Sequence, residues 1–415
     1  MSDAPLQPER PPASRAARLR ELLGLFLKLG ITGFGGPAPV IGMIDDETVT
    51  RRKWLTRDEF LDMMGLTNLI PGPNSTEMAM HIGYLRAGWP GLIVSGAAFI
   101  IPAGLITGVF AWAYTRYGTL PQLAPFFIGV TPAVLAVILT AVWRLSGAAI
   151  RRGKGVQKRV SYPLIGIGLA ALAASLAEVN EIAVLLGGGL LGMFLLRFLD
   201  GRAAREEAAR PLPGVALGWK AIHLPGLAGL AGGAGLAAAG ISLWQIGWFF
   251  LKVGAVLYGS GYVLVAFLQG GLVDQYHWLT QRQLLDAIAV GQFTPGPLLS
   301  TATFVGYLLG GAAGGAVATV AIFLPSFLYV GLLNPLIPRL RRSPWMAAFL
   351  AAVNISSVAL MAAVTVKLAQ STLTGWQTIL IALLALAAGL RWKISSAWLI
   401  LSGGVLGWLF TRLPF

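Results

Sequence analysis

The chain has 415 residues, of which 56% are hydrophobic and only 12% are charged. This charged fraction is well below the roughly 25% typical of soluble domains, so composition predicts a membrane protein. The net charge is +14, but the basic residues lie beside apolar segments, as the positive-inside rule requires, so a nucleic-acid partner is not indicated. Cysteine is absent, which excludes disulfides and thiolate metal sites.

The first 21 residues are polar and rich in Pro and Arg, without the apolar core of a signal peptide. We expect residues 1–21 to form a cytoplasmic tail. Beyond them, short charged loops alternate with apolar stretches of about 20 residues, the helix length that crosses about 30 Å of hydrocarbon. The sequence therefore predicts an all-α, polytopic integral membrane protein.

One unit of sequence occurs twice in the chain. The run FLKLG at Phe26–Gly30 returns as FLKVG at Phe250–Gly254, and WLT at Trp54–Thr56 returns at Trp278–Thr280 with the same displacement. Two copies of one unit are the usual plan of a secondary transporter, in which the substrate lies between the copies. We expect a tail, an N-terminal membrane repeat, a charged linker with a connecting transmembrane helix, and a C-terminal membrane repeat, at 1–21, 22–200, 201–245 and 246–415.

The two copies are expected to have opposite orientations in the membrane. Each has about six apolar segments, and the connecting helix adds one crossing, so the second copy enters from the other side. Loop charges agree, because the basic loop at 151–159 corresponds to an uncharged loop near 369–375, and two other loop pairs also exchange their bias. The sequence thus predicts an inverted-topology repeat.

Segments 22–44 and 60–85 carry Gly/Pro breaks near their middles, at FGGP (Phe34–Pro37) and at PGP (Pro71–Pro73). Irregular backbone at membrane depth is tolerated only where it is buried in protein or lines a cavity. The sequence leaves open whether each segment crosses the membrane with a broken helix or forms a re-entrant hairpin. If both are hairpins, the charged loop 45–59 lies on the cytoplasmic side.

The PGP runs are the most specific local pattern. Proline stops a helix ahead of it and suits the first position of a new helix. The start of that helix presents free N–H groups and a partial positive charge, which favour an oxyanion. The alternative is that PGP only kinks a packing helix. The candidate binding residues are the two runs and the amide and hydroxyl residues after them: Pro71, Gly72, Pro73, Asn74, Ser75, Thr76, Pro295, Gly296, Pro297, Ser300 and Thr301.

Further candidates for substrate binding lie at matched or nearby positions of the two copies. Small residues at the FGGP run and its counterpart permit close approach of the backbone to a ligand or to another helix. Lysines inside apolar segments are costly unless they pair, reach the interface or attract an anion. Amides near the PGP runs are candidate hydrogen-bond donors. These residues are Phe34, Gly35, Gly36 and Gly259, the lysines Lys28 and Lys252, and the amides Asn68 and Gln292.

Glu77 and His81 are four residues apart, so they share a helix face just after the first PGP run. Intramembrane acids and histidines can titrate near neutral pH, and proton coupling through this pair is one hypothesis. The alternative is a local hydrogen-bonded pair. The second copy has no equivalent pair, which predicts unequal roles for the two halves.

Enzyme signatures are missing. The chain has three His and no Cys, and it contains neither a GxxxxGK[ST] loop nor an HExxH run. We therefore expect no enzyme activity, no metal ion and no cofactor.

As a set, the FGGP run after FLKLG, the WLT run followed by Asp62, the PGP run and the two-copy plan resemble the chromate ion transporter family over residues 26–413. The resemblance implies a carrier of the bacterial inner membrane that exports chromate, a tetrahedral dianion similar to sulfate, and gives chromate resistance. It also implies coupling to the membrane potential or to a proton gradient. The implied partners are chromate or a similar oxyanion, protons as coupling ion and the lipid bilayer.

Two alternatives stay open at this point. One is a carrier of sulfate or another tetrahedral oxyanion working in either direction, and the other is an anion channel. The sequence sets neither the stoichiometry of coupling nor the oligomeric state, for which a homodimer is one option.

Overall fold

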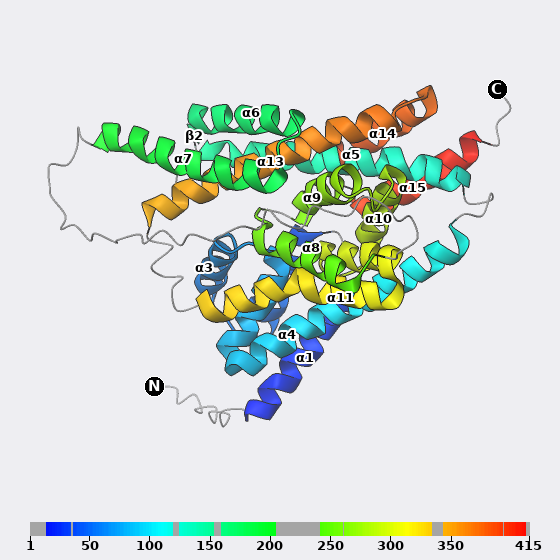
Figure 1. Ribbon diagram of the computed structural model, residues 1–415. Helices are drawn as coiled ribbons and strands as arrows, with labels where there is room; N and C mark the ends of the chain where they lie inside the picture. Colours follow the sequence, from blue (N-terminus) through cyan, green and yellow to red (C-terminus); the bar gives the residue numbers. More distant parts are fainter. Residues whose placement is uncertain are drawn as a thin grey trace, which may run out of the picture.

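The computed structural model describes residues 14–34, 36–118, 124–152, 159–204, 241–259, 261–333, 343–392 and 394–411. Within these ranges the chain is almost entirely helical (Figure 1), with one short antiparallel pair of strands, β1 (Arg151–Arg152) and β2 (Arg159–Val160). The predicted all-α class is confirmed. Most of the predicted linker and connecting helix, at 205–240, lies outside the described residues, as do residues 1–13 of the tail.

Five helices in the described part of the chain are long and apolar enough to cross a membrane. They are Asn74–Tyr117, Pro125–Ala149, Glu181–Leu199, Leu298–Leu332 and Pro344–Thr372. Their lengths match or exceed the roughly 20 residues that a bilayer requires, so the chain has the multiple spans that its composition predicts.

The described helices of the first copy, with a π-helical turn η1, are α1 (Arg15–Thr32), α2 (Pro37–Asp45), η1 (Asp46–Arg51), α3 (Arg57–Thr67), α4 (Asn74–Tyr117), α5 (Ala124–Ala149), α6 (Tyr162–Leu176) and α7 (Glu181–Ala204). Those of the second copy are α8 (Leu243–Val256), η2 (Gly261–Val263), α9 (Leu264–Leu268), η3 (Gln269–Gln275), α10 (Gln281–Phe293), η4 (Leu298–Ser300), α11 (Thr301–Leu333), α13 (Pro344–Thr372), α14 (Trp376–Arg391) and α15 (Ser396–Phe410).

The WLT runs end in equivalent helix starts. Before α3, Thr56 Oγ1 accepts from the N–H of Glu59 at 3.2 Å, and Glu59 Oε2 accepts from the N–H of Thr56 at 2.8 Å. Before α10, Thr280 and Gln283 make the same reciprocal pair at 3.2 Å and 2.9 Å. This capping box satisfies two N–H groups that the first turn leaves free, which explains why the repeated run begins a helix.

The long helices α4 and α11 are kinked at equivalent positions. Gly88 has φ of +65° and Gly311 has φ of +62°, a conformation that glycine adopts without the penalty of a Cβ. The turns on either side of the first kink lie so close that a Cβ added at Gly83 would clash with the carbonyl oxygen of Gly91. In the second kink, a Cβ added at Gly306 would clash with that of Gly314. Each long helix therefore consists of a short arm and a long arm, and the sequence repeat is also a repeat of backbone shape.

The helices form two layers, which are visible one above the other in Figure 1. One layer contains α4 and α11 packed on each other, with α1 on α4 and α8 on α11. The other contains α5 and α13 packed on each other. In this second layer the copies exchange partners, because α6 and α7 pack on α13 of the second copy, whereas α14 and α15 pack on α5 of the first. The short helices α9 and α10 contact elements of the second layer and lie between the layers.

The first broken segment is a hairpin. Lys28, near the end of α1, pairs with Glu47 at 2.7 Å. Arg86 links the early part of α1 to the residues just before α3. It pairs with Glu21 of α1 at 2.7 Å, and its guanidinium lies 3.9 Å from the ring centre of Trp54. The later residue of α1, Lys28, therefore meets the earlier residue of the returning chain, and the earlier residue, Glu21, is linked to the later one, Trp54. This order requires the chain after the break to run antiparallel to α1. The structure thus favours the re-entrant alternative for this segment.

The second broken segment also returns to its starting side. The chain enters through α3, turns at the PGP run and comes back through the short arm of α4. Across the tip, Asn74 Nδ2 donates to Asn68 Oδ1 at 2.9 Å. At the base, Arg86 ends the short arm beside Trp54, which precedes α3. Both ends of this hairpin therefore lie together, and the long arm of α4 then crosses the membrane.

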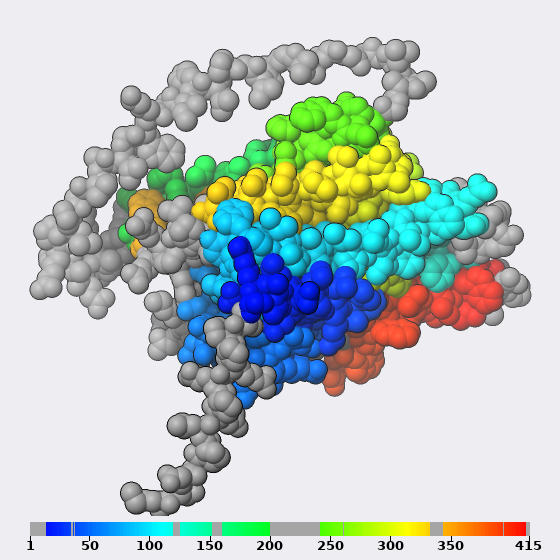
Figure 2. Space-filling view, turned by 90° about the horizontal axis from the view of Figure 1, so that it is seen from below, coloured from blue at the N-terminus to red at the C-terminus, as the bar shows by residue number. Residues whose placement is uncertain are grey.

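The hairpins of the two copies meet inside the molecule. The N–H of Gly296, in the second PGP run, donates to the carbonyl oxygen of Gly33, in the turn after α1, at 2.8 Å. Close packing of α1 depends on Gly30, where a Cβ would lie 2.8 Å from the carbonyl oxygen of Phe99. Figure 2 shows α1 and α4 side by side on one face of the molecule. Glycine at these positions lets the backbones approach, as is common between membrane helices.

Candidate functional site

A cavity of about 280 Å³ lies beside the tip of the second hairpin of the first copy. Its polar wall combines both copies, because Asn68 and Asn74 come from the first and Asn354 and Ser357 come from α13 of the second. A water molecule occupies about 30 Å³ of liquid, so the cavity has room for a small ion with part of its hydration shell. Its remaining lining residues are Leu145, Ala148, Ala149, Gly259, Val263, Val358 and Met361.

The first copy presents the start of α4 to this cavity. The first N–H groups of a helix have no intrahelical acceptor, and Pro73, which precedes α4, makes no side-chain cap. Asn68 uses its amide N–H on the carbonyl of Met64 at 2.9 Å and its oxygen on Asn74, which fixes the position of both amides. The local positive potential of the helix start and the amide of Asn74 suit a negatively charged ligand.

The second copy closes the cavity with α13 and the turn after α8. Gly259 has φ of +97°, and a Cβ added there would lie 3.4 Å from Asn354 Oδ1. Ser357 Oγ lies 2.9 Å from the carbonyl of Val353 and 3.2 Å from that of Tyr258, so its proton has two acceptors in reach. Glycine in a left-handed conformation thus lets the turn pack against the polar stretch of α13.

Asn354 and Ser357 are site residues that the sequence analysis missed. They lie in the run NISS, inside the apolar helix Pro344–Thr372. A side-chain amide is expensive within a membrane span unless it has a function. That signal was present in the sequence, but only the shared cavity shows that the run faces Asn68 and Asn74 of the first copy.

The Glu77 and His81 side chains are buried, with 0% and 2% of their surface exposed. Among the described residues, neither carboxylate oxygen of Glu77 nor Nε2 of His81 has a hydrogen-bond partner. The structure therefore contains no hydrogen bond between the two side chains. Glu77 instead lies against Gly72 of the PGP run, where Ser326 of α11 also approaches.

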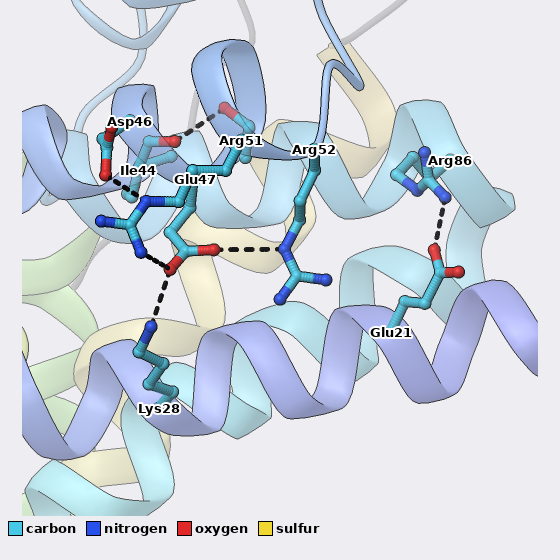
Figure 3. Close-up of polar contacts among 9 residues, drawn as sticks. Glu21, Lys28, Ile44, Asp46, Glu47, Arg51, Arg52 and Arg86 are labelled. Carbon is cyan, nitrogen blue, oxygen red and sulfur yellow. Dashed lines mark hydrogen bonds and ion pairs between the residues drawn. The ribbon is translucent and has the colours of Figure 1, made fainter.

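The matched lysines do not line the cavity. Figure 3 shows Lys28 reaching from α1 to Glu47, which also meets Arg52 at 3.2 Å and Arg51 at 3.7 Å. The hydrogen bond from Lys28 is the main cause that holds the pKa of Glu47 below its usual value, with Arg52 adding to it. Lys252 lies over the ring of Phe249, with its Nζ 5.9 Å from the ring centre.

The other predicted residues of the first copy lie around the hairpin tips. Pro71, Gly72, Pro73, Ser75 and Thr76 are buried beside the cavity-lining amides. Phe34 is exposed, and a Cβ at Gly36 would lie 3.5 Å from the hydroxyl of Tyr262. Gly35 lies outside the described residues.

The break in the second copy has no comparable cavity in the described part of the chain. Gln292 and Thr301 border a void of only about 10 Å³ whose other lining residues are mostly apolar. Ser300 is buried there, and Pro295, Gly296 and Pro297 form the buried tip. Of the predicted residues of the second copy, Gly259 therefore lines the cavity and Lys252 lies over Phe249, whereas the others gather at their own break.

These features define a class of protein, a multi-pass α-helical membrane protein built from two copies of one unit, whose broken helices border a polar cavity. This plan is typical of secondary transporters. The sequence signature described as "Chromate transporter" matches the chain twice, over residues 20–193 and 244–408. The chain therefore belongs to the chromate transporter family, and members of that family are transporters rather than enzymes.

Curated relatives cover nearly the whole chain. It is 32% identical to the "Chromate transport protein" of Cupriavidus metallidurans over 94% of this chain and 92% of the relative. It is also 32% identical to the "Probable chromate transport protein" of Synechococcus elongatus, over 91% of each. The "Chromate transport protein" of Pseudomonas aeruginosa is 29% identical over 98% of this chain and 95% of the relative. No solved structure matches the chain.

Proposed function

We propose that this protein is a secondary active transporter that exports chromate across the bacterial inner membrane and so gives chromate resistance. The names of the relatives support the substrate. The observation that carries the proposal is the cavity in which amides and a hydroxyl from both copies surround the start of α4. In a two-copy transporter the substrate is expected at such an interface.

The chemistry of the cavity suits a tetrahedral dianion. Its polar lining residues are uncharged, and the helix start adds a partial positive charge. Neutral donors can replace part of the hydration shell of an oxyanion without binding it so tightly that release becomes slow. Sulfate has the same shape and charge as chromate, so the same site accommodates the alternative substrate.

We infer that repeats 22–200 and 246–415 are inverted in the membrane and that the N-terminus is cytoplasmic. The re-entrant hairpins support this, since they return the charged loop 45–59, with its consecutive basic residues Arg51, Arg52 and Lys53, to the side on which α1 begins. The far end of the long arm of α4 supports it as well, because Tyr114 donates to Asp286 of α10 at 2.7 Å. That contact places the end of the long arm of α4 beside α10, in the early part of the second copy.

Proton coupling through Glu77 and His81 completes the proposal. A carboxyl group buried without an ionic partner binds or releases a proton according to its surroundings, and such groups mark proton pathways in membrane transporters. Glu77 is less than one helical turn beyond Asn74, so a movement of the hairpin tip reaches both the proton site and the cavity. The driving force is then the proton-motive force or the membrane potential.

Uptake of labelled chromate into inverted membrane vesicles tests this function. The measurement is made with and without an imposed proton gradient, with sulfate as competitor and with vesicles that lack the protein as control. Saturable accumulation that depends on the gradient is the expected result. Uptake of sulfate without uptake of chromate would overturn the chromate assignment, and flux that follows voltage without saturation or coupling would indicate a channel.

A further inference from the structure

The two PGP tips have different surroundings. At the first tip, the space that a Cβ of Gly72 would fill is bordered by Oε1 of Glu77 and Oγ of Ser326, which belongs to the second copy. At the second tip, a Cβ of Gly296 would lie 2.6 Å from the Cβ of Ala103, which belongs to the first copy. Ser326 follows Pro325 and Ala103 follows Pro102, so the two residues occupy equivalent positions. The first tip therefore faces two polar side chains, whereas the second faces an apolar side chain and two backbone carbonyl oxygens.

Both polar groups at the first tip are buried without a partner. Glu77 and Ser326 each have 0% of their surface exposed, and neither the carboxylate oxygens nor the hydroxyl makes a hydrogen bond to another described residue. A buried polar group without a partner is rare and costly, and an ionised carboxylate is the most costly case. Close packing of helices does not explain why two polar groups are buried here without hydrogen-bond partners, so a functional role is indicated.

The charged and titratable groups around Glu77 are few. His81 lies on its own helix, one turn away. Tyr258, at the turn after α8, is within electrostatic reach of Glu77 and also of Tyr329 on α11. No lysine or arginine in the described part of the chain forms an ion pair with Glu77. Its charge is thus balanced by a proton or by hydrogen bonds, not by a fixed cation.

We propose that Ser326 is the positioning residue of a single proton-binding site, which it forms with Glu77 across the interface between the two copies. The two groups border the same space but make no hydrogen bond to each other in this structure. A hydroxyl group donates to an ionised carboxylate and accepts from a protonated one, so a side-chain rotation that brings them within hydrogen-bond distance lets Ser326 serve both states of Glu77. The proton adds to one carboxylate oxygen, and no other covalent bond changes. The second tip has Ala103 at the position of Ser326, so it offers no equivalent hydroxyl. This inference rests on the proposed proton coupling and adds that Ser326 positions Glu77 for proton binding.

The test is an infrared titration of the purified protein, which follows the carbonyl band of protonated carboxyl groups as the pH changes. The component lost in Glu77→Gln belongs to Glu77. In Ser326→Ala its midpoint is expected to rise by about one pH unit, because the lost hydroxyl stabilises the carboxylate more than the neutral acid. Ser326→Thr restores the hydroxyl and is expected to return the midpoint. Ser95→Ala, which also removes a buried hydroxyl without a partner, is the matched control and should leave the midpoint unchanged.

Equal midpoints in the parent protein and in Ser326→Ala, with both proteins folded and monodisperse, would overturn the inference. So would an equal shift in Ser95→Ala, because it would show a general effect of lost packing. The titration requires no transport, so its result is separate from that of the vesicle assay. Failure of chromate and sulfate uptake in the parent would remove the proposed function, whereas the midpoint alone decides the role of Ser326.

Discussion

At the scale of single residues, equal sequence does not ensure equal surroundings. Lys28 and Lys252 are matched, yet Lys28 pairs with Glu47 while Lys252 lies over the ring of Phe249. The position equivalent to Glu47 in the second copy is Gly271, which offers no carboxylate. A lysine inside an apolar segment is stabilised by a nearby acidic or aromatic side chain, and which side chain lies nearby depends on the tertiary structure.

Asn354→Asp is expected to lower chromate uptake at least about tenfold. The change keeps the size of the side chain but places a negative charge in the wall of a cavity for a dianion, and repulsion of about 1.4 kcal/mol already gives that factor. Initial rates in inverted vesicles measure the effect. Asn180→Asp is the matched control, since Asn180 accepts from the N–H of Ile182 at the start of α7 and Asp fills that role equally well. An unchanged rate in Asn354→Asp would remove this residue from the substrate path.

Lys28→Ala is expected to reduce stability by about 1 kcal/mol at neutral pH, because half-exposed ion pairs contribute little more. The pKa of Glu47 is held below its usual 4.5, so the ion pair stabilises the fold above that pH, and the benefit disappears as pH falls through the lowered value. Thermal unfolding in detergent at pH 7 and pH 4 measures the difference. Arg20→Ala, at an exposed cation of the same helix, is the control. A loss of stability that grows at pH 4 would contradict this account.

At the scale of elements, the sequence shows where helices break, but it does not show whether the chain then crosses the membrane or turns back. The capping boxes at Thr56 and Thr280 and the glycine kinks at Gly88 and Gly311 are local, so short stretches of sequence are sufficient to produce them. Whether segment 22–44 crosses the membrane or returns depends on the pair Lys28–Glu47. It also depends on the contacts of Arg86 with Glu21 and Trp54, which lie just before and after the segment. Such contacts join residues far apart in the chain, and no local pattern encodes them.

Gly30→Ala is expected to destabilise the packing of α1 on α4 by about 1–3 kcal/mol, the usual cost of overpacking. The added Cβ would lie 2.8 Å from the carbonyl oxygen of Phe99 and 3.1 Å from that of Ala98, and backbone atoms cannot rotate away. Gly24→Ala on the same helix has open space around its Cβ and should be neutral or stabilising, since Ala is the better helix former. The thermal midpoints of the two variants provide the comparison, and equal midpoints would argue against close contact at Gly30.

At the scale of the whole molecule, the two copies are not separate globular halves. The last helix of each copy packs on the second long helix of the other copy, so that α7 lies on α13 and α15 lies on α5. Each layer therefore contains helices of both copies, so a movement of one layer against the other would not separate the copies. The polar cavity lies where α13 and the second hairpin of the first copy meet, so such a movement would change its lining.

Cysteines placed singly at Gly118 and Ser371 are expected to react with an impermeant reagent from the outside of intact cells. Gly118 ends α4 and Ser371 lies in the last turn of α13, so inverted repeats put both on the external side. The chain has no native Cys, so the background is low. Gly147→Cys, near the end of α5, should react only after permeabilisation. Labelling of just one of the first two from outside would contradict the inverted arrangement.

Composition, repeats and breaks along the sequence determine that this protein is a two-copy α-helical membrane protein of the transporter type, because apolar length and Gly/Pro positions act locally on the chain. They also place the amides Asn68 and Asn74 at a helix break that borders the cavity. Only the tertiary structure joins them to Asn354 and Ser357, pairs Lys28 with Glu47 and leaves Glu77 beside Ser326. The reason is physical: these groups come from segments tens to hundreds of residues apart, and packing of the two copies decides which polar groups share a space from which the surrounding helices exclude lipid.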